Sequence, residues 1–202
     1  MLKLYDNADS GNGYKVRLLL NWLERPFERV ELDIFAGASR TPEFLALNPN
    51  GRIPTLQMED GHCLAESGAI LFYLAEDTPY WPTDKRARSE VLQWMFFEQY
   101  SHEPFIAVLR AWTRHGPMTD DRRSQWAARE KGGYAALDVM EGHLKDRKFL
   151  VGERPTIADI ALFAYTHVAD QGGFDLTGYP AVRAWIARIE ELPRHIAIDD
   201  LD

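Results

Sequence analysis

The sequence predicts an α/β domain followed by an all-helical domain, and three observations carry this prediction. Strand and helix patterns alternate over residues 1–77. Two prolines, Pro79 and Pro82, then interrupt the pattern. Beyond them, apolar residues recur only at helical spacing. We therefore expect one domain at residues 1–77, a linker at 78–84 and a helical domain at 85–202.

The first domain begins with a short strand at residues 3–6, and a helix follows in which apolar side chains recur every three or four residues. Alternating apolar residues predict a second strand at residues 30–34. A strand, a helix and a strand in this order indicate a parallel pair with a right-handed crossover. A short helix then begins near Pro42 and ends before Asn48.

A hairpin and another helix complete this domain. Asp60-Gly61 is a turn signal between residues 55–58 and 62–65, and an apolar helical run follows from Ala69 to Ala75. The order of elements over residues 1–77 is therefore β-α-β-α-β-β-α.

The helical domain opens with two long helices. The first runs from Lys85 to about Arg114, and Pro104 should kink or interrupt it. The second carries its apolar residues between Trp126 and Leu144, and two long antiparallel helices suggest a bundle. In the first helix we expect four buried side chains, namely Val91, Trp94, Met95 and Phe97.

Two shorter helices follow. Residues 156–159, Thr-Ile-Ala-Asp, match a capping box with Asp in place of the usual Glu, and they introduce an apolar helix from Ile157 to Val168. Pro180 suits the first turn of the last helix, which ends before Pro193. This last helix should bury Val182, Trp185, Ile186 and Ile189.

Composition limits the function classes. Of the 202 residues 46% are hydrophobic, which suffices for a substantial core, and the formal net charge of -8 argues against a nucleic-acid partner. No apolar run reaches the length of a membrane span and no signal peptide is evident, so we expect a cytoplasmic protein without a membrane partner. Cys63, the only cysteine, is interpreted as a buried small side chain rather than a catalytic thiol.

The stretch from Asn48 to Leu56 carries more functional information than any other. A cis bond is plausible at Ile53-Pro54, and it could leave the Ile53 backbone free to pair with an extended peptide. Downstream, Glu66-Ser67 opens a helix, where N–H groups and a hydroxyl suit a carboxylate and Glu66 could accept an ammonium. The alternative is an ordinary turn proline and an acidic residue that complements the helix dipole.

The order and spacing of these features resemble the glutathione-binding half of the glutathione transferases. Residues 48–56, N-P-N-G-R-I-P-T-L, precede a hairpin, E-S and an apolar helix, as in that family. The stretches F-L-V-G, T-I-A-D-I and Y-P-A-V-R-A-W in the second domain are also typical of it. The resemblance implies a thioredoxin-like first domain, and glutathione as the co-substrate.

The resemblance also implies roles for the residues of this stretch. Ile53 and Pro54 would hold the cysteinyl part of glutathione, and Glu66 and Ser67 the γ-glutamyl head. Arg52 would reach the glycyl carboxylate, although a solvated surface arginine is the common alternative.

The first helix should supply the chemistry. Glutathione reacts as a thiolate, and hydrogen bonds together with a positive helix end lower the pKa of a thiol. The stretch from Ser10 to Lys15 is most similar to bacterial family members with a Ser/Thr-x-Asn-Gly-x-Lys pattern, which implies Ser10 and Asn12 as thiolate donors. Helix capping is their alternative role, and Tyr5 is the rival hydroxyl.

The second substrate is expected to be a small hydrophobic electrophile. Tyr100, Glu103 and Phe105 are the candidate residues of its pocket, with ordinary core packing as the alternative. Family members are usually two-fold dimers, so we expect a homodimer.

Other chemistries lack their signatures. The six histidines show neither H-E-x-x-H nor paired Cys/His spacing, so we expect no metal, and no dinucleotide fingerprint follows Gly11-x-Gly13. Within the resemblance three functions remain open. They are conjugation of glutathione to an electrophile, reduction of disulfides or peroxides by glutathione, and a binding protein that keeps the fold without turnover.

Overall fold

The computed structural model describes residues 1–201. The chain forms two compact units. The first comprises Met1–Thr78 together with the chain from Pro193 onward, and the second comprises Pro79–Leu192. The sequence assigned the last residues to the helical domain, so their association with the first unit was not predicted.

The first unit has the predicted order of elements. Its strands and helices are β1 (Leu2–Asp6), α1 (Gly11–Trp22), β2 (Phe27–Glu31), the 3-10 turn η1 (Ala38–Arg40), α2 (Pro42–Leu47), β3 (Thr55–Gln57), β4 (Cys63–Ala65) and α3 (Ser67–Ala75). The prediction of the second strand at residues 30–34 was wrong by three residues. The strand begins at Phe27 because the chain pairs with β1 there, and most of the alternating apolar stretch lies beyond its end.

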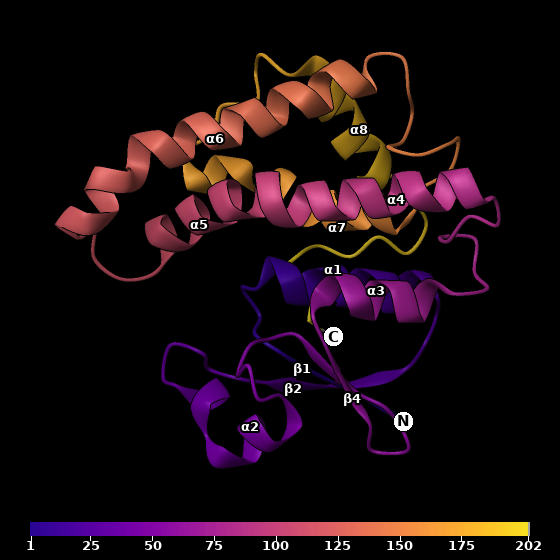
Figure 1. Cartoon of the computed structure of the whole chain (residues 1–202), viewed down its shortest axis with the longest axis vertical. Helices are drawn as coiled ribbons and strands as arrows, with labels where there is room; N and C mark the ends of the chain where they lie inside the picture. The colour runs from indigo at the N-terminus through magenta and orange to yellow at the C-terminus, as the bar shows by residue number, and fades with distance from the viewer. Residues whose placement is uncertain (202) are drawn as a thin grey trace. The chain divides into compact units, whose positions relative to one another are not determined.

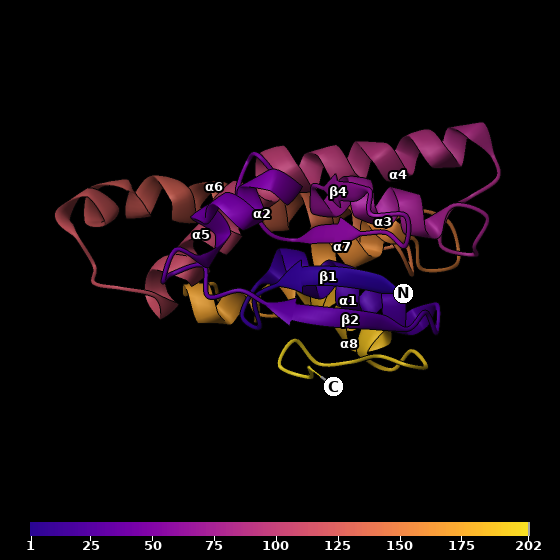
Figure 2. The ribbon, with the colours of Figure 1, turned by 90° about the horizontal axis from the view of Figure 1, so that it is seen from below.

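The sheet is mixed, with strand order β2-β1-β3-β4. β1 and β2 are parallel, as predicted, whereas β3 is antiparallel to both β1 and β4. Helices α1 and α3 lie on one face of the sheet and α2 on the other (Figure 1), and the strands lie side by side in the view from below (Figure 2). This is the thioredoxin-like arrangement that the resemblance implied.

The core of the first unit lies between the sheet and the helices α1 and α3. Alternate residues of β1 point inward, so Leu4 is fully buried, and Leu56 on β3 is buried beside it. Val16 on α1 and Ile70 on α3 are fully buried as well. Burial of each such side chain stabilises the fold by about 1.5–3 kcal/mol.

The end of the chain is hydrogen-bonded to α1. The Tyr14 hydroxyl donates to the carbonyl of Ile196 at 2.6 Å, and the Asn21 amide donates to the carbonyl of Arg194 at 2.6 Å. The Arg17 guanidinium donates to the carbonyls of Ile198 and Asp200. Figure 1 shows this segment, in yellow, running along the helix.

The second unit is helical throughout. Its elements are α4 (Lys85–Phe97), the π-helical segment η2 (Glu98–His102), α5 (Glu103–Arg114), α6 (Asp120–Leu144), α7 (Ile157–Thr166), the 3-10 turn η3 (Ala169–Gly172) and α8 (Pro180–Glu190). The long helix predicted from Lys85 to Arg114 is interrupted, as expected. The interruption precedes Pro104, because proline fits within the first turn of α5, where no N–H bond is lost.

The predicted capping box at the start of α7 is confirmed. The Thr156 hydroxyl accepts from the backbone N–H of Ala158, and the Asp159 carboxylate accepts from the backbone N–H of Thr156. Asp159 also accepts from the N–H of Leu150 and the indole N–H of Trp185. One buried carboxylate therefore connects α7, α8 and the loop before them.

Three burial predictions differ from the structure. Phe97, Ile186 and Cys63 are only half-buried, although Val91, Trp94, Met95, Val182, Trp185 and Ile189 are buried as expected. Cys63 lies in the edge strand β4, where one side of the sheet ends. Burial nevertheless raises the pKa of its thiol, which disfavours the thiolate.

Candidate functional site

Three segments of the first unit meet at one end of its sheet. Thr55, the first residue of β3, pairs with Ala65, the last of β4, and with Tyr5 near the end of β1. Residues 53–54, 66–67 and 7–13 are attached directly to these positions. The strand register therefore brings together the loop before β3, the start of α3 and the start of α1, which carry the predicted glutathione site.

Ser10 is the N-cap of α1. Its hydroxyl oxygen accepts from the backbone N–H of Gly13 at 3.1 Å, so the capping role is real. A capping hydroxyl accepts at its oxygen and still carries a proton that it can donate. The cap also leaves Ser10 at the positive end of the helix dipole, where an anion is stabilised.

Asn12 joins the first turn of α1 to the start of α3. Its side-chain oxygen accepts from the ammonium of Lys15 at 2.7 Å and from the hydroxyl of Ser67 at 3.3 Å. Lys15 and Ser67 are both buried. The two helix N-termini are therefore connected through one polar cluster of Asn12, Lys15 and Ser67.

The loop before β3 is organised by Asn48. The buried Asn48 amide donates to the carbonyl of Arg52 at 2.8 Å and to the hydroxyl of Thr55 at 3.1 Å. The peptide bond between Ile53 and Pro54 is cis, as the sequence suggested. Ile53 itself precedes the ladder of β3, which begins at Thr55.

Arg52 and Glu66 present exposed side chains beside this loop and helix. Glu66 has φ of 70° and ψ of 116°, a backbone conformation that residues with a Cβ seldom adopt. It is the N-cap of α3, yet its carboxylate makes no capping bond to the helix. Such conformations concentrate at ligand sites, and the side chain of Glu66 is exposed there.

A buried ion pair lies beneath the first turn of α1. The carboxylate of Asp6, the last residue of β1, pairs with the guanidinium of Arg17 at 2.9 Å, and both are buried. Burial raises the pKa of Asp6 from 3.8 to about 6, and the Arg17 charge opposes that rise. A Cβ at Gly13 would lie 1.5 Å from Asp6 Oδ1, so only glycine lets the helix approach this closely.

The rival hydroxyl, Tyr5, is engaged within the sheet. Its hydroxyl lies 3.2 Å from the side-chain oxygen of Gln57, to which it donates, and its ring packs edge-on against Phe44 at 5.7 Å. These contacts favour the structural role for Tyr5.

The three candidate residues for the second substrate belong to the second unit. Tyr100 is 84% exposed in η2, and Glu103 accepts from the Gln99 amide at 2.9 Å. Phe105 is half-buried on α5, and its ring fills the space that a Cβ at Gly132 would occupy. Phe105 therefore has a packing role within this unit, whereas Tyr100 is open to solvent.

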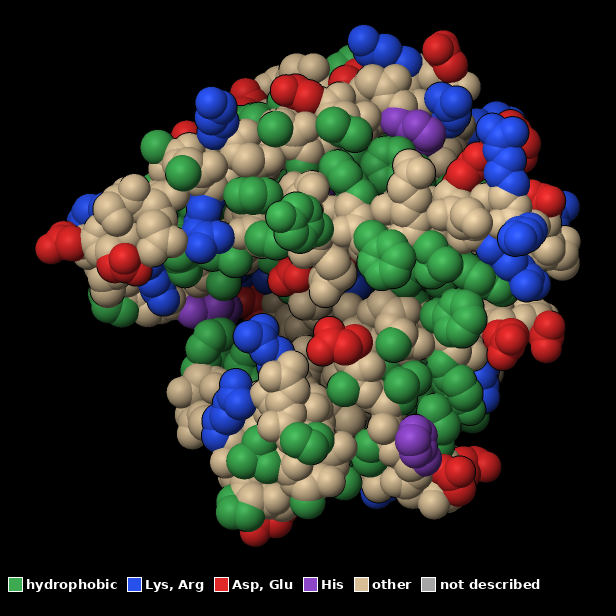
Figure 3. Space-filling model, in the orientation of Figure 1, with side chains coloured by type: hydrophobic (Ala, Val, Ile, Leu, Met, Phe, Trp, Pro, Cys, Tyr) green, Lys and Arg blue, Asp and Glu red, His purple; other side chains and the backbone are tan. Residues whose placement is uncertain are grey.

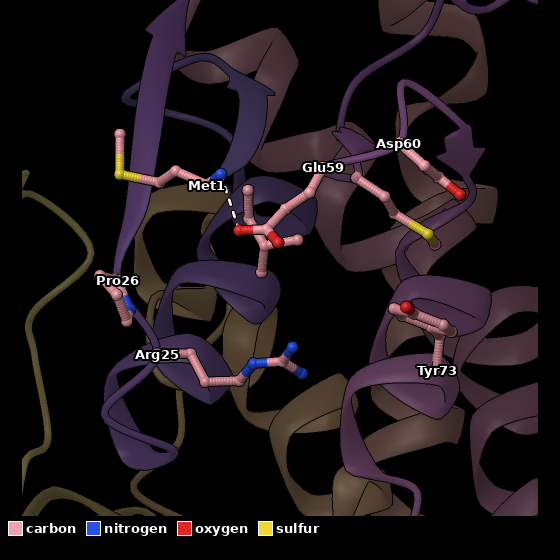
Figure 4. Close-up of a pocket in the computed structure, with 8 residues that line it drawn as sticks. Met1, Arg25, Pro26, Glu59, Asp60 and Tyr73 are labelled. Atoms are coloured by element: carbon pink, nitrogen blue, oxygen red, sulfur yellow. Dashed lines mark ion pairs between the residues drawn. The ribbon is translucent and has the colours of Figure 1, made fainter.

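A separate cavity of about 610 Å³ lies where β1 begins, at the opposite end of that strand from Ser10. The amino terminus of Met1 pairs there with Glu59 at 2.7 Å, and Arg25, Asp60 and Tyr73 also line the cavity (Figure 4). The charged residues that line this cavity are exposed, so it offers no buried polar cluster comparable with that of Asn12, Lys15 and Ser67.

Two features are absent from the described residues, 1–201. No group of three or more His, Cys, Asp or Glu side chains is arranged to hold a metal ion. None of the helices in this range combines the length and the apolar character that a membrane crossing requires.

Sequence reasoning did not assign roles to Lys15 or Asn48. Lys15 was visible as the last member of the Ser-x-Asn-Gly-x-Lys pattern, three residues after Asn12 and thus on the same helix face. The sequence indicated only a turn at Asn48. Its hydrogen bonds to Arg52 and Thr55 depend on the folded conformation of the loop.

Comparison with known families decides the family membership. The model of the glutathione S-transferase N-terminal domain matches residues 1–76, and that of the C-terminal domain matches residues 105–193. The chain belongs to the glutathione S-transferase family. The predicted resemblance is therefore confirmed, and both halves of the chain carry it.

Individual members of this family are similar over nearly the whole chain. A glutathione S-transferase from Pseudomonas fluorescens Pf-5 has a TM-score of 0.96 and 51% identity, covering 98% of this chain and 99% of its own. A second family member from that organism, solved with two glutathione bound, has a TM-score of 0.83 and 27% identity, covering 96% and 89%. The disulfide-bond oxidoreductase YfcG of Escherichia coli is 32% identical, covering 96% of this chain and 92% of its own.

Proposed function

We propose that this protein binds glutathione at the end of its sheet and activates the thiol as a thiolate for addition to a small hydrophobic electrophile. The observation that carries the proposal is the hydrogen bond between Asn12 and Ser67. It joins the N-termini of α1 and α3, two positive helix ends, into one site suited to an anionic ligand. Glutathione carries two carboxylates and one ammonium, and its sulfur gains a negative charge when the thiol ionises.

Each part of glutathione has a proposed partner. The backbone of Ile53 pairs with the cysteinyl residue, as an added strand pairs with a sheet edge, and Pro54 borders it. The backbone N–H groups at the start of α3, that of Ser67 among them, hold the γ-glutamyl carboxylate, and Glu66 accepts its ammonium. Arg52, whose side chain is exposed, reaches the glycyl carboxylate.

The proposed chemistry takes place at the start of α1. The Ser10 hydroxyl and the Asn12 amide donate to the sulfur, which lowers the pKa of the thiol and releases its proton to water. The thiolate then attacks the electrophile, a carbon–sulfur bond forms and the leaving group departs with the electron pair. Donors to the sulfur act because they stabilise the charged form more than the neutral thiol.

The test is steady-state conjugation of glutathione to a chloronitrobenzene. We expect turnover by the wild-type protein, and a loss of roughly tenfold to a hundredfold in Ser10→Ala or Asn12→Ala, the range for one charge-assisted donor. Tyr5→Phe is the matched hydroxyl control and should retain activity. Unchanged rates in both Ser10→Ala and Asn12→Ala would remove these residues from the mechanism.

Reduction of disulfides by glutathione is the second candidate, and two comparisons favour it. YfcG is named a disulfide-bond oxidoreductase, and one family member was solved with two glutathione bound. Cys63 is the only cysteine, so this chain has no internal dithiol, and two glutathione molecules would supply both electrons. One thiolate forms a mixed disulfide with the substrate, and the second releases it and yields glutathione disulfide.

A coupled assay separates the two reactions. A disulfide such as hydroxyethyl disulfide, with glutathione reductase and NADPH, reports glutathione disulfide formation, whereas the chloronitrobenzene reports conjugation. Activity in the first assay alone would favour the reductase. Failure of glutathione to bind in calorimetry at millimolar concentration would favour a binding protein that keeps the fold without turnover.

We also propose a two-fold homodimer for this protein. Support comes from exposed aromatic side chains on the second unit, since Phe96 is 69% and Tyr100 84% exposed. Hydrophobic side chains gather along the course of α4 (Figure 3). Large exposed apolar groups of this kind mark association surfaces. Light scattering should give twice the mass of the chain, and Phe96→Glu should shift it toward the monomer.

A further inference from the structure

The Asn12 side chain can be oriented from chemistry alone. Its partner at 2.7 Å is the ammonium of Lys15, which has three donors and no acceptor. The atom of Asn12 that faces Lys15 is therefore the oxygen, since an amide nitrogen would oppose donor to donor. The Ser67 hydroxyl donates to the same oxygen at 3.3 Å.

This orientation determines what Asn12 offers to a ligand. With its oxygen engaged by two donors, the amide presents N–H groups to any further partner. The last torsion of an asparagine side chain is broad and roughly two-fold, so without such contacts the oxygen could turn toward the ligand instead. An amide oxygen beside a thiolate would repel it, whereas an N–H stabilises it.

Lys15 is placed to hold this orientation firmly. Its side chain is 1% exposed, and it lies three residues after Asn12 on the same face of α1. A hydrogen bond that involves an ionised group is stronger than a neutral one. The contact from Lys15 is also shorter than that from Ser67, so Lys15 is the main constraint on the amide.

We infer that Lys15 is a positioning residue of the proposed glutathione site, and that its ammonium orients the Asn12 amide so that an N–H faces the sulfur. This inference rests on the proposed function. Lys15 acts through Asn12 and makes no contact with the reacting atoms itself. It extends the set of residues that the reaction needs beyond those that touch the ligand.

The pKa of bound glutathione tests this role, measured from the ultraviolet absorbance of the thiolate as pH is varied. In Lys15→Met, which keeps an apolar stem, we expect this thiol pKa to rise by about one or more, a loss of roughly tenfold in thiolate at neutral pH. In an Asn12→Ala background, Lys15→Met should not raise the thiol pKa further, because Lys15 acts through the missing amide. A wild-type pKa in folded Lys15→Met, or an equal rise in the Asn12→Ala background, would overturn the inference.

Asn12→Asp supplies the second variant. The carboxylate keeps an acceptor for Lys15 and Ser67, so the fold is retained even if Lys15→Met unfolds, but the N–H donor is lost. We expect a raised thiol pKa in Asn12→Asp, and an unchanged value would contradict the inference. Calorimetry of wild-type protein with glutathione separates the two proposals, because absence of binding there rejects the proposed function itself.

Discussion

Gly13 illustrates how one residue sets the geometry of the site. The helix α1 passes so close to Asp6 that any side chain at position 13 would collide with a buried carboxylate. Gly13→Ala should therefore destabilise the protein by about 3 kcal/mol or more, at the upper end of overpacking effects. Urea unfolding followed by circular dichroism measures the loss.

Gly142 provides the matched control for this change. It is an exposed glycine within α6, and a Cβ there would meet nothing within 4 Å. Gly142→Ala should stabilise its helix by about 0.5–1 kcal/mol through propensity alone. Equal effects of the two substitutions would show that the close approach to Asp6 has no energetic consequence.

The Asp6 carboxyl makes stability depend on pH. Its pKa is about 6 in the folded protein and 3.8 without the fold, so near pH 5 the folded state holds a proton that the unfolded chain has released. The contribution of Asp6 to the unfolding free energy is greatest below its unfolded-state pKa of 3.8. This contribution falls by about 3 kcal/mol as pH rises through the folded-state pKa of about 6.

Asp6→Asn removes this titration and should flatten the pH dependence between about pH 4 and 6. The variant is expected to be less stable overall, because the Arg17 guanidinium loses its buried partner. The diagnostic quantity is the slope of the unfolding free energy with pH, measured for both proteins. Identical slopes would contradict a raised pKa at Asp6.

At the scale of elements, Asp159 is the most connected cap in the second unit. It accepts from two backbone N–H groups, the Thr156 hydroxyl and the indole of Trp185. Asp159→Ala leaves these buried donors without their acceptor and should cost about 3 kcal/mol or more in unfolding free energy.

Asp84 is the corresponding control, because it caps α4 at an exposed position with one bond to the N–H of Ala87. Asp84→Ala should cost about 1 kcal/mol, the ordinary value of an N-cap. Thermal unfolding of both variants checks the difference. Comparable losses would mean that burial and extra donors add nothing to the Asp159 cap.

The elements were largely predictable from the sequence, because hydrophobic period and caps are local properties. Pro42 and Pro180 sit in the first turns of their helices, as their missing N–H groups require. The bounds of β2 were not predictable, since its register depends on pairing with β1. The π-helical segment before Pro104 has no local signature that separates it from a simple kink.

The candidate site was predictable to a smaller extent. Ser10, Ile53 and Glu66 stood out because the family pattern marks them, and the strand register brings their segments to one end of the sheet. The contact between Asn12 and Ser67 joins residues 55 positions apart, so no periodicity could predict it.

At the scale of the whole molecule, the end of the chain is part of the first unit. The Arg17 guanidinium on α1 donates to the Asp6 carboxylate and to the carbonyls of Ile198 and Asp200. One side chain therefore links the end of β1 to the segment after α8. Sequence could not predict this, because backbone carbonyls accept the bonds irrespective of residue type.

Deletion of the residues after Leu192 should therefore loosen α1. We expect faster amide hydrogen exchange in α1, since Tyr14, Arg17 and Asn21 lose their carbonyl partners. Exchange in α7, which belongs to the second unit, is the internal control and should be unchanged. Equal protection of α1 in the shortened chain would show that the segment is dispensable.

In the proposed complex, glutathione binds at the sheet end with its sulfur against the start of α1. A crystal structure of the protein with glutathione tests it most directly. We expect the sulfur within hydrogen-bonding distance of Ser10 or Asn12 and the γ-glutamyl group at Glu66 and Ser67. Glutathione bound elsewhere, or bound here with its sulfur directed away from α1, would contradict it.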